Sequence, residues 1–145
     1  MTDTNELIRF LDAQNQVYLK ALSEIKKGKK ETHWMWYIFP QIKGLGSSET
    51  AKYYAIKDLK EATAYLEHPI LGKHLIEITE AVWNLKGKTA TQLLGTPDDM
   101  KLRSCMTLFA SVKNTNPIFQ KILVKYFNGL ADDLTLQLIN GTAVK

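Results

Sequence analysis

Apolar residues recur every three or four positions along most of the chain, which is the period of an amphipathic helix. One stripe runs from Leu7 to Ile25, and Gly28 is placed to end its helix. Another stripe runs from Pro69 to Leu85. No convincing run alternates apolar and polar residues with the period of two that a half-buried strand requires. The pattern therefore predicts an all-α protein.

Capping residues, glycines and prolines divide the rest of the chain into short helices. We expect eight or nine short helices in a single helical domain of residues 1–145, with no repeat that would indicate a solenoid. In the first half of the chain, we expect Thr32 to cap a helix that Pro40 stops, Ser47 or Ser48 to cap the next helix after a glycine turn, and Asp58 with Glu61 to begin a helix that ends near Glu67. In the second half, we expect a short helix at 90–94, a helix that starts at Thr96-Pro97, and a helix that starts at Asn116-Pro117 and ends at Gly129. Asp132 or Asp133 should cap a last helix that runs through Ile139, with Gly141 beyond it.

Composition and charge exclude several classes of protein. Hydrophobic residues make up 45% and charged residues 23%, which is typical of a soluble globular protein. The net charge of +4 is spread evenly, with +2 in residues 1–46 and +2 in residues 47–145, so no basic arm suggests a nucleic-acid partner. The longest uninterrupted apolar stretch, 34–39, is far shorter than the roughly 18 residues of a membrane helix. We therefore expect neither nucleic acid nor membrane as a partner.

The numbers and positions of cysteine and histidine residues limit which disulfides and metal sites the chain can form. A lone cysteine, Cys105, forms no internal disulfide, and the polar N-terminus lacks the features of a signal peptide, so a cytoplasmic location is expected. The three histidines, His33, His68 and His74, share no metal-ligand spacing. We predict no metal site and no cofactor.

The densest chemical feature is the aromatic segment between residues 33 and 41. Trp34, Trp36 and Tyr37 are interpreted as a pocket wall that stacks on a planar ligand, with His33 and Gln41 supplying hydrogen bonds. The alternative is that these rings belong to the hydrophobic core, because buried aromatic residues are common and ligand pockets are few. The sequence leaves both interpretations open.

A glycine-serine turn follows the aromatic segment. Gly44, Gly46, Ser47 and Ser48 lead into a helix, and backbone N–H groups at such a start bind anions. The stretch does not match either glycine-rich phosphate-binding motif. The alternative is a flexible connection that ends in a serine cap.

The helix that begins near Asp98 carries the third set of polar groups. Asp99, Lys101, Arg103, Ser104 and Thr107 supply charges and hydroxyls suited to an anion or a sugar phosphate. The alternative is that the charged residues form ordinary helix ion pairs, worth a few tenths of a kcal/mol.

The chain closely resembles the uncharacterised family called domain of unknown function 1810. The resemblance rests on Arg9-Phe10 with Ala13-Gln14, on KETHWMWYIFPQIKGLG at residues 30–46, on residues 62–72 and on residues 99–109. It implies a single, mainly helical domain and no established reaction. Some members carry the label calpastatin, but calpastatin repeats are disordered and poor in aromatic residues, unlike this sequence.

A fainter similarity links the chain to the NADAR superfamily, whose members act on or bind NAD and ADP-ribose derivatives. It rests on the order of three short segments, at 37–40, at 47–54 and at 98–101. This similarity implies a nucleotide or ADP-ribose-like anionic ligand. An enzyme of this kind would hydrolyse an N-glycosidic bond with Glu49 or His33 as its acid or base.

A second hypothesis makes the protein a non-catalytic interaction module or a homodimer. Surplus aromatic residues would then line a protein interface, with Trp34 and Tyr37 on an exposed apolar patch. The two hypotheses differ in whether the aromatic rings surround a cavity or lie on the surface.

Overall fold

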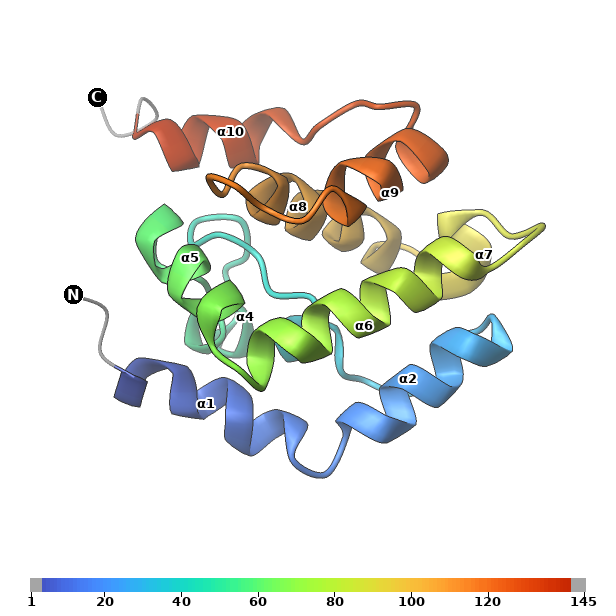
Figure 1. The fold of residues 1–145 in the computed structure, drawn as a ribbon, viewed down its shortest axis with the longest axis horizontal. Helices are drawn as coiled ribbons and strands as arrows, with labels where there is room; N and C mark the ends of the chain where they lie inside the picture. The colour runs from blue at the N-terminus through green and yellow to red at the C-terminus, as the bar shows by residue number, and fades with distance from the viewer. Residues whose placement is uncertain (1–3, 142–145) are drawn as a thin grey trace.

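Helix α6 (Leu71–Asn84) follows the apolar stripe at 69–85 and crosses the middle of the molecule in Figure 1. Leu71, Leu75, Ile78 and Val82 lie on this stripe and are no more than 1% exposed. Their spacing places them on one helix face, and burying each side chain contributes about 1.5–3 kcal/mol. The buried face of α6 is therefore part of the hydrophobic core.

The computed structural model describes residues 4–141. Within that range the chain forms ten helices and no strand, so the all-α prediction is confirmed, with one or two helices more than expected. The remaining helices are α1 (Thr4–Gln14), α2 (Tyr18–Lys27), α3 (Met35–Ile38), α4 (Glu49–Tyr53), α5 (Leu59–Glu67), α7 (Ala90–Leu94), α8 (Asp98–Ala110), α9 (Ile118–Phe127) and α10 (Asp133–Asn140).

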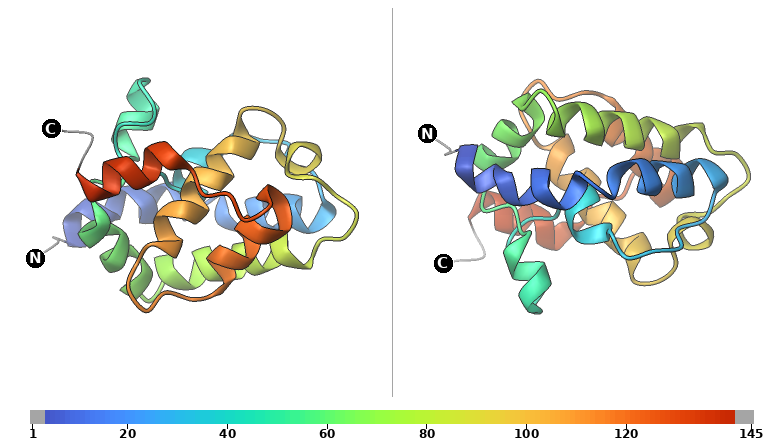
Figure 2. Two further views of the ribbon diagram at one scale, coloured as in Figure 1. Left: turned by 90° about the horizontal axis from the view of Figure 1, so that it is seen from above. Right: turned by 90° about the horizontal axis from the view of Figure 1, so that it is seen from below.

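Helix α8 occupies the centre of the packing. It contacts α5, α7, α9 and α10, and the side chains of Leu102, Cys105, Met106 and Phe109 are fully buried. A helix covered on several sides buries residues all around its axis rather than along one stripe. Helices α1 and α2 lie end to end along one side of the molecule, with α9 and α10 on the opposite side, and α4 projects from the body (Figures 1 and 2).

Several predicted helix boundaries are confirmed by the backbone. Gly28 ends α2 with a φ of 86°, and Gly141 ends α10 with a φ of 72°. The Asp58 side chain caps α5 by accepting from the Glu61 N–H (2.9 Å), and Asp132 caps α10 in the same way. These local signals act within one turn of helix, so the sequence alone predicts them.

The continuous helix expected from Leu7 to Ile25 is wrong. The chain forms α1 and α2 there, separated by a turn at 15–17. The turn allows the Tyr18 ring to stack on His74 of α6, with ring centroids 3.7 Å apart. A tertiary contact therefore overrides the local spacing, as it often does for helix propensity.

Two predicted caps are also wrong. Thr32 does not cap α3, because its hydroxyl and its N–H both donate to the Glu24 carboxylate. Thr96 does not cap α8, which begins at Asp98, and the Thr96 hydroxyl bonds the Asp99 carboxylate instead. In both places a nearby carboxylate competes for the hydroxyl that would have capped the helix.

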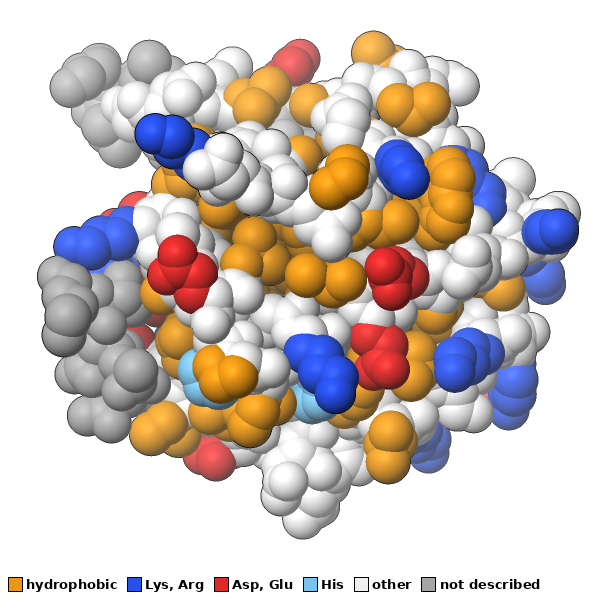
Figure 3. All heavy atoms as spheres, viewed as in Figure 1, with side chains coloured by type: hydrophobic (Ala, Val, Ile, Leu, Met, Phe, Trp, Pro, Cys, Tyr) orange, Lys and Arg blue, Asp and Glu red, His pale blue; other side chains and the backbone are white. Residues whose placement is uncertain are grey.

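Over the middle of the face in Figure 3, basic and acidic side chains are interspersed with apolar ones, and Lys and Arg side chains gather along its right edge. Within residues 4–141, no helix combines the length and the apolar character needed to cross a bilayer.

Candidate functional site

The segment after α3 is fixed by pairing between distant residues. Ile42 pairs with Ile56 in an isolated parallel bridge, and both side chains are buried. The Lys43 N–H donates to the Ile56 carbonyl, and the Ile56 N–H donates to the Gln41 carbonyl, each at 2.8 Å. Residues 41–43 therefore lie beside the segment that follows α4.

The turn at 43–46 packs closely against two helices. Gly44 has a φ of +109°, and a Cβ atom there would lie 3.2 Å from the Leu138 side chain of α10. A Cβ atom on Gly46 would lie 2.5 Å from the Cβ atom of Ala51 in α4. Both contacts explain why small residues occupy the turn.

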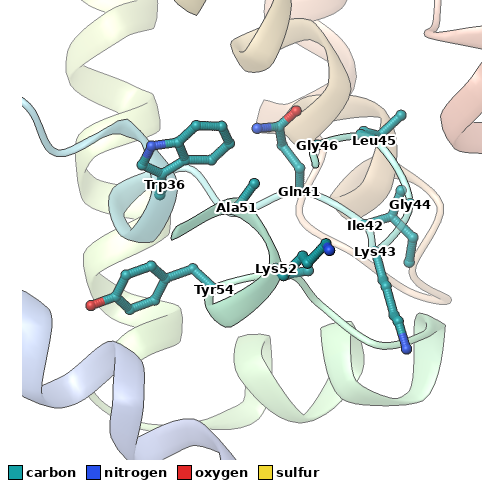
Figure 4. Close-up of a pocket in the computed structure, with 11 residues that line it drawn as sticks. Trp36, Gln41, Ile42, Lys43, Gly44, Leu45, Gly46, Ala51, Lys52 and Tyr54 are labelled. Carbon is teal, nitrogen blue, oxygen red and sulfur yellow. The ribbon is translucent and has the colours of Figure 1, made fainter. Parts of the chain in front are cut away.

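Two adjacent cavities flank this turn, and we call them together the Trp36 cleft. The larger has a volume of about 410 Å³ and lies between the turn and α4. The smaller has a volume of about 210 Å³ and lies between the turn, the start of α8 and the residue before α10. Trp36, Gln41, Leu45 and Gly46 line both cavities. In Figure 4 the Trp36 ring and the Gln41 amide extend toward one another, and Lys43 and Lys52 lie farther along the cavity.

The Trp36 cleft has a positive electrostatic character. Lys43, Lys52 and Lys101 line it, together with a single carboxylate, Asp132. Lys101 also pairs with Asp98 of the same helix (3.2 Å), as the ion-pair interpretation expected, so the positive charge of the cleft comes mainly from Lys43 and Lys52. The Lys101 ammonium lies 3.8 Å from the centroid of the Trp36 ring, a cation–π contact. Lys43 and Lys52 are exposed, so solvent and salt screen part of their field, and what remains favours an anion over a cation in the cleft.

Comparison with known proteins identifies the family. The family described as "Protein of unknown function (DUF1810)" matches residues 4–139. The chain belongs to the DUF1810 family. The chain is also similar to the conserved hypothetical protein Rv1873 from Mycobacterium tuberculosis, solved by crystallography at 1.38 Å. That similarity has a TM-score of 0.93 and 44% sequence identity, and it covers 95% of this chain and 99% of that chain.

No curated protein is significantly similar to the chain in sequence. The predicted membership of DUF1810 is confirmed, and the fainter similarity to the NADAR superfamily is not.

The cleft brings together six of the residues singled out from the sequence. These residues come from the aromatic segment, the glycine turn and α8. The three segments face one another across the smaller cavity. They are Trp36, Gln41, Gly44, Gly46, Lys101 and Ser104.

The other aromatic residues of the segment have different positions. Trp34 is fully buried, and its indole N–H donates to Glu24 (2.8 Å), so it belongs to the core. Tyr37 is half-buried against Tyr54, and its hydroxyl donates to the His33 carbonyl. The expected exposed patch of Trp34 and Tyr37 is therefore wrong for Trp34, because its polar N–H has a buried partner.

Glu24, which binds Trp34, is an anchor that the sequence did not reveal. Burial acts to raise the pKa of this carboxyl, but hydrogen bonds from Glu31, Thr32 and Trp34 outweigh burial and lower the pKa from 4.5 to about 2. Donors to the charged form stabilise it. The ionised carboxylate thereby fixes the loop that leads to Trp36.

The predicted catalytic residues lie outside the lining of both cavities. His33 and Glu49 are exposed, and Glu49 is the first residue of α4. Ser47 is exposed as well, and Ser48 is used as the cap of α4, where its hydroxyl accepts from the Ala51 N–H (3.0 Å). With only five residues, α4 is too short to supply an anion site at its N-terminus.

Three predicted residues of α8 bind other parts of the fold. The Asp99 carboxylate accepts from the Thr91 hydroxyl (2.6 Å) and joins α7 to α8. Arg103 donates to two backbone carbonyls of the loop before α10, each at 2.8 Å. The Thr107 hydroxyl accepts from the Asp132 N–H (2.9 Å). The side chains of Asp99, Arg103 and Thr107 therefore hold neighbouring segments in place around the cleft.

Sequence reasoning missed four polar or aromatic residues of the cleft, namely Lys43, Lys52, Tyr54 and Asp132. Lys43 was within reach of sequence reasoning, because it directly precedes the glycine turn. The other three come from segments that approach the turn only through the fold. Among the described residues, no group of three or more His, Cys, Asp or Glu side chains is placed to hold a metal ion.

Proposed function

We propose that the Trp36 cleft binds a small anionic ligand with a planar ring, of the nucleotide or ADP-ribose class. One observation carries the proposal: Trp36 lines two adjoining cavities whose walls hold three lysines and one carboxylate. The indole offers a surface for a planar ring, and the lysines attract phosphate groups. The larger cavity has a volume within the usual range for small-molecule sites.

The division into two cavities suits a ligand with two dissimilar parts. The smaller cavity places Lys101 and the hydroxyl of Ser104 near Trp36. The larger cavity places Lys43 and Lys52 on the far side of the turn. A planar ring beside Trp36 would therefore place its phosphate chain toward the cations of one of the two cavities.

A hydrolytic role requires a group that activates water or protonates the leaving atom. Asp132 is the carboxylate in the cleft lining, and its Oδ2 atom accepts from Ser104 and from Thr135. The Asp132 carboxylate already caps α10, and Glu49 and His33 lie outside the lining of the cleft. The arrangement favours binding over catalysis.

The test is calorimetric titration with ADP-ribose, AMP and adenosine. We expect ADP-ribose and AMP to bind and adenosine to bind at least tenfold more weakly, because adenosine lacks phosphate. The double variant Lys43→Gln/Lys52→Gln should weaken ADP-ribose binding at least tenfold, whereas the matched control Lys113→Gln should not. At a hundred times its dissociation constant, a ligand should also raise the unfolding free energy by about 2.7 kcal/mol. Absence of binding by both anions would refute the proposal.

A hydrolytic role is tested separately by product analysis. Incubation with ADP-ribose or NAD followed by chromatography should show intact ligand if the cleft only binds. Release of nicotinamide from NAD, or of adenine from ADP-ribose, that is lost in Asp132→Asn would instead establish catalysis. The variant must retain ADP-ribose binding for this comparison to hold.

A further inference from the structure

A second set of polar groups meets where α1 ends, α2 begins and α6 passes. Gln14, at the end of α1, is 2% exposed, and its amide nitrogen donates to the Tyr37 carbonyl (2.8 Å) and to the Tyr65 hydroxyl (2.9 Å). A carbonyl only accepts hydrogen bonds, so the amide atom that faces Tyr37 must be the nitrogen. The amide oxygen of Gln14 is therefore the atom that lies 2.8 Å from His74 Nδ1.

This orientation fixes the tautomer of His74. Because the Gln14 oxygen is an acceptor, His74 must carry its hydrogen on Nδ1, and Nε2 then has a free lone pair. Burial lowers the pKa of His74, with Lys73 acting in the same direction and Glu77 opposing it. The ring is thus a neutral acceptor near pH 7.

The His74 ring is held from its other side by Tyr18. The two rings are stacked, with centroids 3.7 Å apart and planes within 8° of parallel. The Tyr18 hydroxyl donates to the Glu77 carboxylate, and its oxygen also lies 3.2 Å from the His74 carbonyl oxygen. A ring with its tautomer, plane and position all constrained resembles the oriented acceptors of small-molecule sites rather than a solvated surface histidine.

His74 lines a cavity of about 850 Å³ formed by α1, α2 and α6. Leu11, Leu19 and Ile70 supply an apolar part of the wall, and Leu19 is 78% exposed. Histidine, acidic, basic and apolar side chains all appear on this face of the molecule in Figure 3.

The charges of this cavity differ from those of the Trp36 cleft. Asp12 and Glu77 supply two carboxylates against one cation, Lys73. Carboxylates and the free His74 Nε2 atom are hydrogen-bond acceptors, so they select ligands that present donors. A negative balance opposes anions.

We infer that this cavity is a second small-molecule site, which takes a polyhydroxylated ligand without negative charge, such as a neutral or amino sugar. A ligand hydroxyl donates to His74 Nε2, a second hydroxyl donates to the Glu77 carboxylate, and the apolar wall contacts the C–H face of the ligand. The site is separate from the Trp36 cleft, so it stands whether or not that cleft binds nucleotides.

The first experiment measures the His74 tautomer by long-range ¹H–¹⁵N NMR on the unmodified chain at pH 7. We expect His74 to be protonated on Nδ1. His68 is an internal control, because its Nδ1 atom accepts from the backbone N–H groups of Ile70 (3.1 Å) and Leu71 (3.2 Å), which requires protonation on Nε2. The same spectrum should show opposite tautomers for the two rings. An Nε2–H tautomer or a charged ring at His74 would overturn the inference.

The second experiment titrates glucose, glucosamine and glucuronate while following the ring signals of His74. We expect glucose and glucosamine to shift these signals in a saturable way, and glucuronate to bind at least tenfold more weakly because it is an anion. Calorimetric titration measures the variants, because His74→Gln has no ring signals: His74→Gln and Glu77→Gln should each weaken glucose binding at least tenfold, and His68→Gln should leave it unchanged. His74 signals that stay undisturbed at high concentrations of glucose and glucosamine, or equal binding of glucuronate, would overturn the inference.

Discussion

The Glu24 carboxylate is the feature whose energetic contribution can be worked out most directly. It is 2% exposed and accepts hydrogen bonds from Glu31 N (2.8 Å), Thr32 N (3.1 Å), Thr32 Oγ1 (2.7 Å) and Trp34 Nε1 (2.8 Å). The substitution Glu24→Gln tests it well. An amide oxygen still accepts from Trp34, and the amide nitrogen donates to the Thr32 hydroxyl, so the variant should fold.

The magnitude follows from the lowered pKa. A shift from 4.5 to about 2 corresponds to about 3 kcal/mol of unfolding free energy, since one pKa unit is about 1.4 kcal/mol. Because the pKa is lower in the folded state, this stabilisation is fully present above pH 4.5 and is lost as the pH falls toward 2. At pH 3, about 2 kcal/mol of it should be gone.

The assay is urea unfolding of the native chain and of Glu24→Gln at pH 7 and pH 3. The other carboxylates titrate in both proteins, so their contributions cancel in the difference between the two unfolding free energies. The native chain should be more stable at pH 7, and its advantage should shrink by about 2 kcal/mol at pH 3. The control Glu80→Gln removes an exposed carboxylate and should show no such change. A stability difference that stays constant across this pH range would refute the reasoning.

Three further substitutions test the packing that shapes the sites. Gly46→Ala places a Cβ atom 2.5 Å from that of Ala51, so it should cost about 2 kcal/mol and weaken ADP-ribose binding. Gly72→Ala places a Cβ atom 2.1 Å from the backbone oxygen of Leu66 and should cost about 3 kcal/mol. Arg103→Gln loses two hydrogen bonds to backbone carbonyls and should cost about 2 kcal/mol. Urea unfolding measures all three, and unchanged stability would contradict the contact concerned.

The sequence predicts the parts of the fold that depend on neighbouring residues. Gly28, Asp58 and Asp132 end or begin helices as expected, because a cap acts on backbone groups within one turn. The break between α1 and α2 could not be predicted in this way. It depends on Tyr18 reaching His74, which lies 56 residues away along the chain.

The candidate site shows the same division. The aromatic segment and α8 meet in the structure, where Trp36 and Lys101 lie in contact. The sequence alone could not show which polar residues of α8 line the cleft and which bind other parts of the fold. Arg103 is as well placed on the helix as Lys101 to bind an anion, yet it binds backbone carbonyls, because the loop before α10 ends beside it. Lys101 lies over the Trp36 ring and also pairs with Asp98 in the first turn of α8 (3.2 Å), so the tertiary arrangement places it at the cleft without freeing it from its local ion pair.

Gln14 connects the two proposed sites physically. Its buried amide bonds the backbone of Tyr37, the residue after Trp36, and it also fixes the tautomer of His74. Removing one member of such a network leaves the remaining buried polar groups unsatisfied, so the damage spreads beyond one contact. A Gln14 variant would therefore disturb both sites at once and could not distinguish them. The variants Glu77→Gln and Lys43→Gln/Lys52→Gln remove none of the Gln14 hydrogen bonds, so each tests one proposal independently of the other.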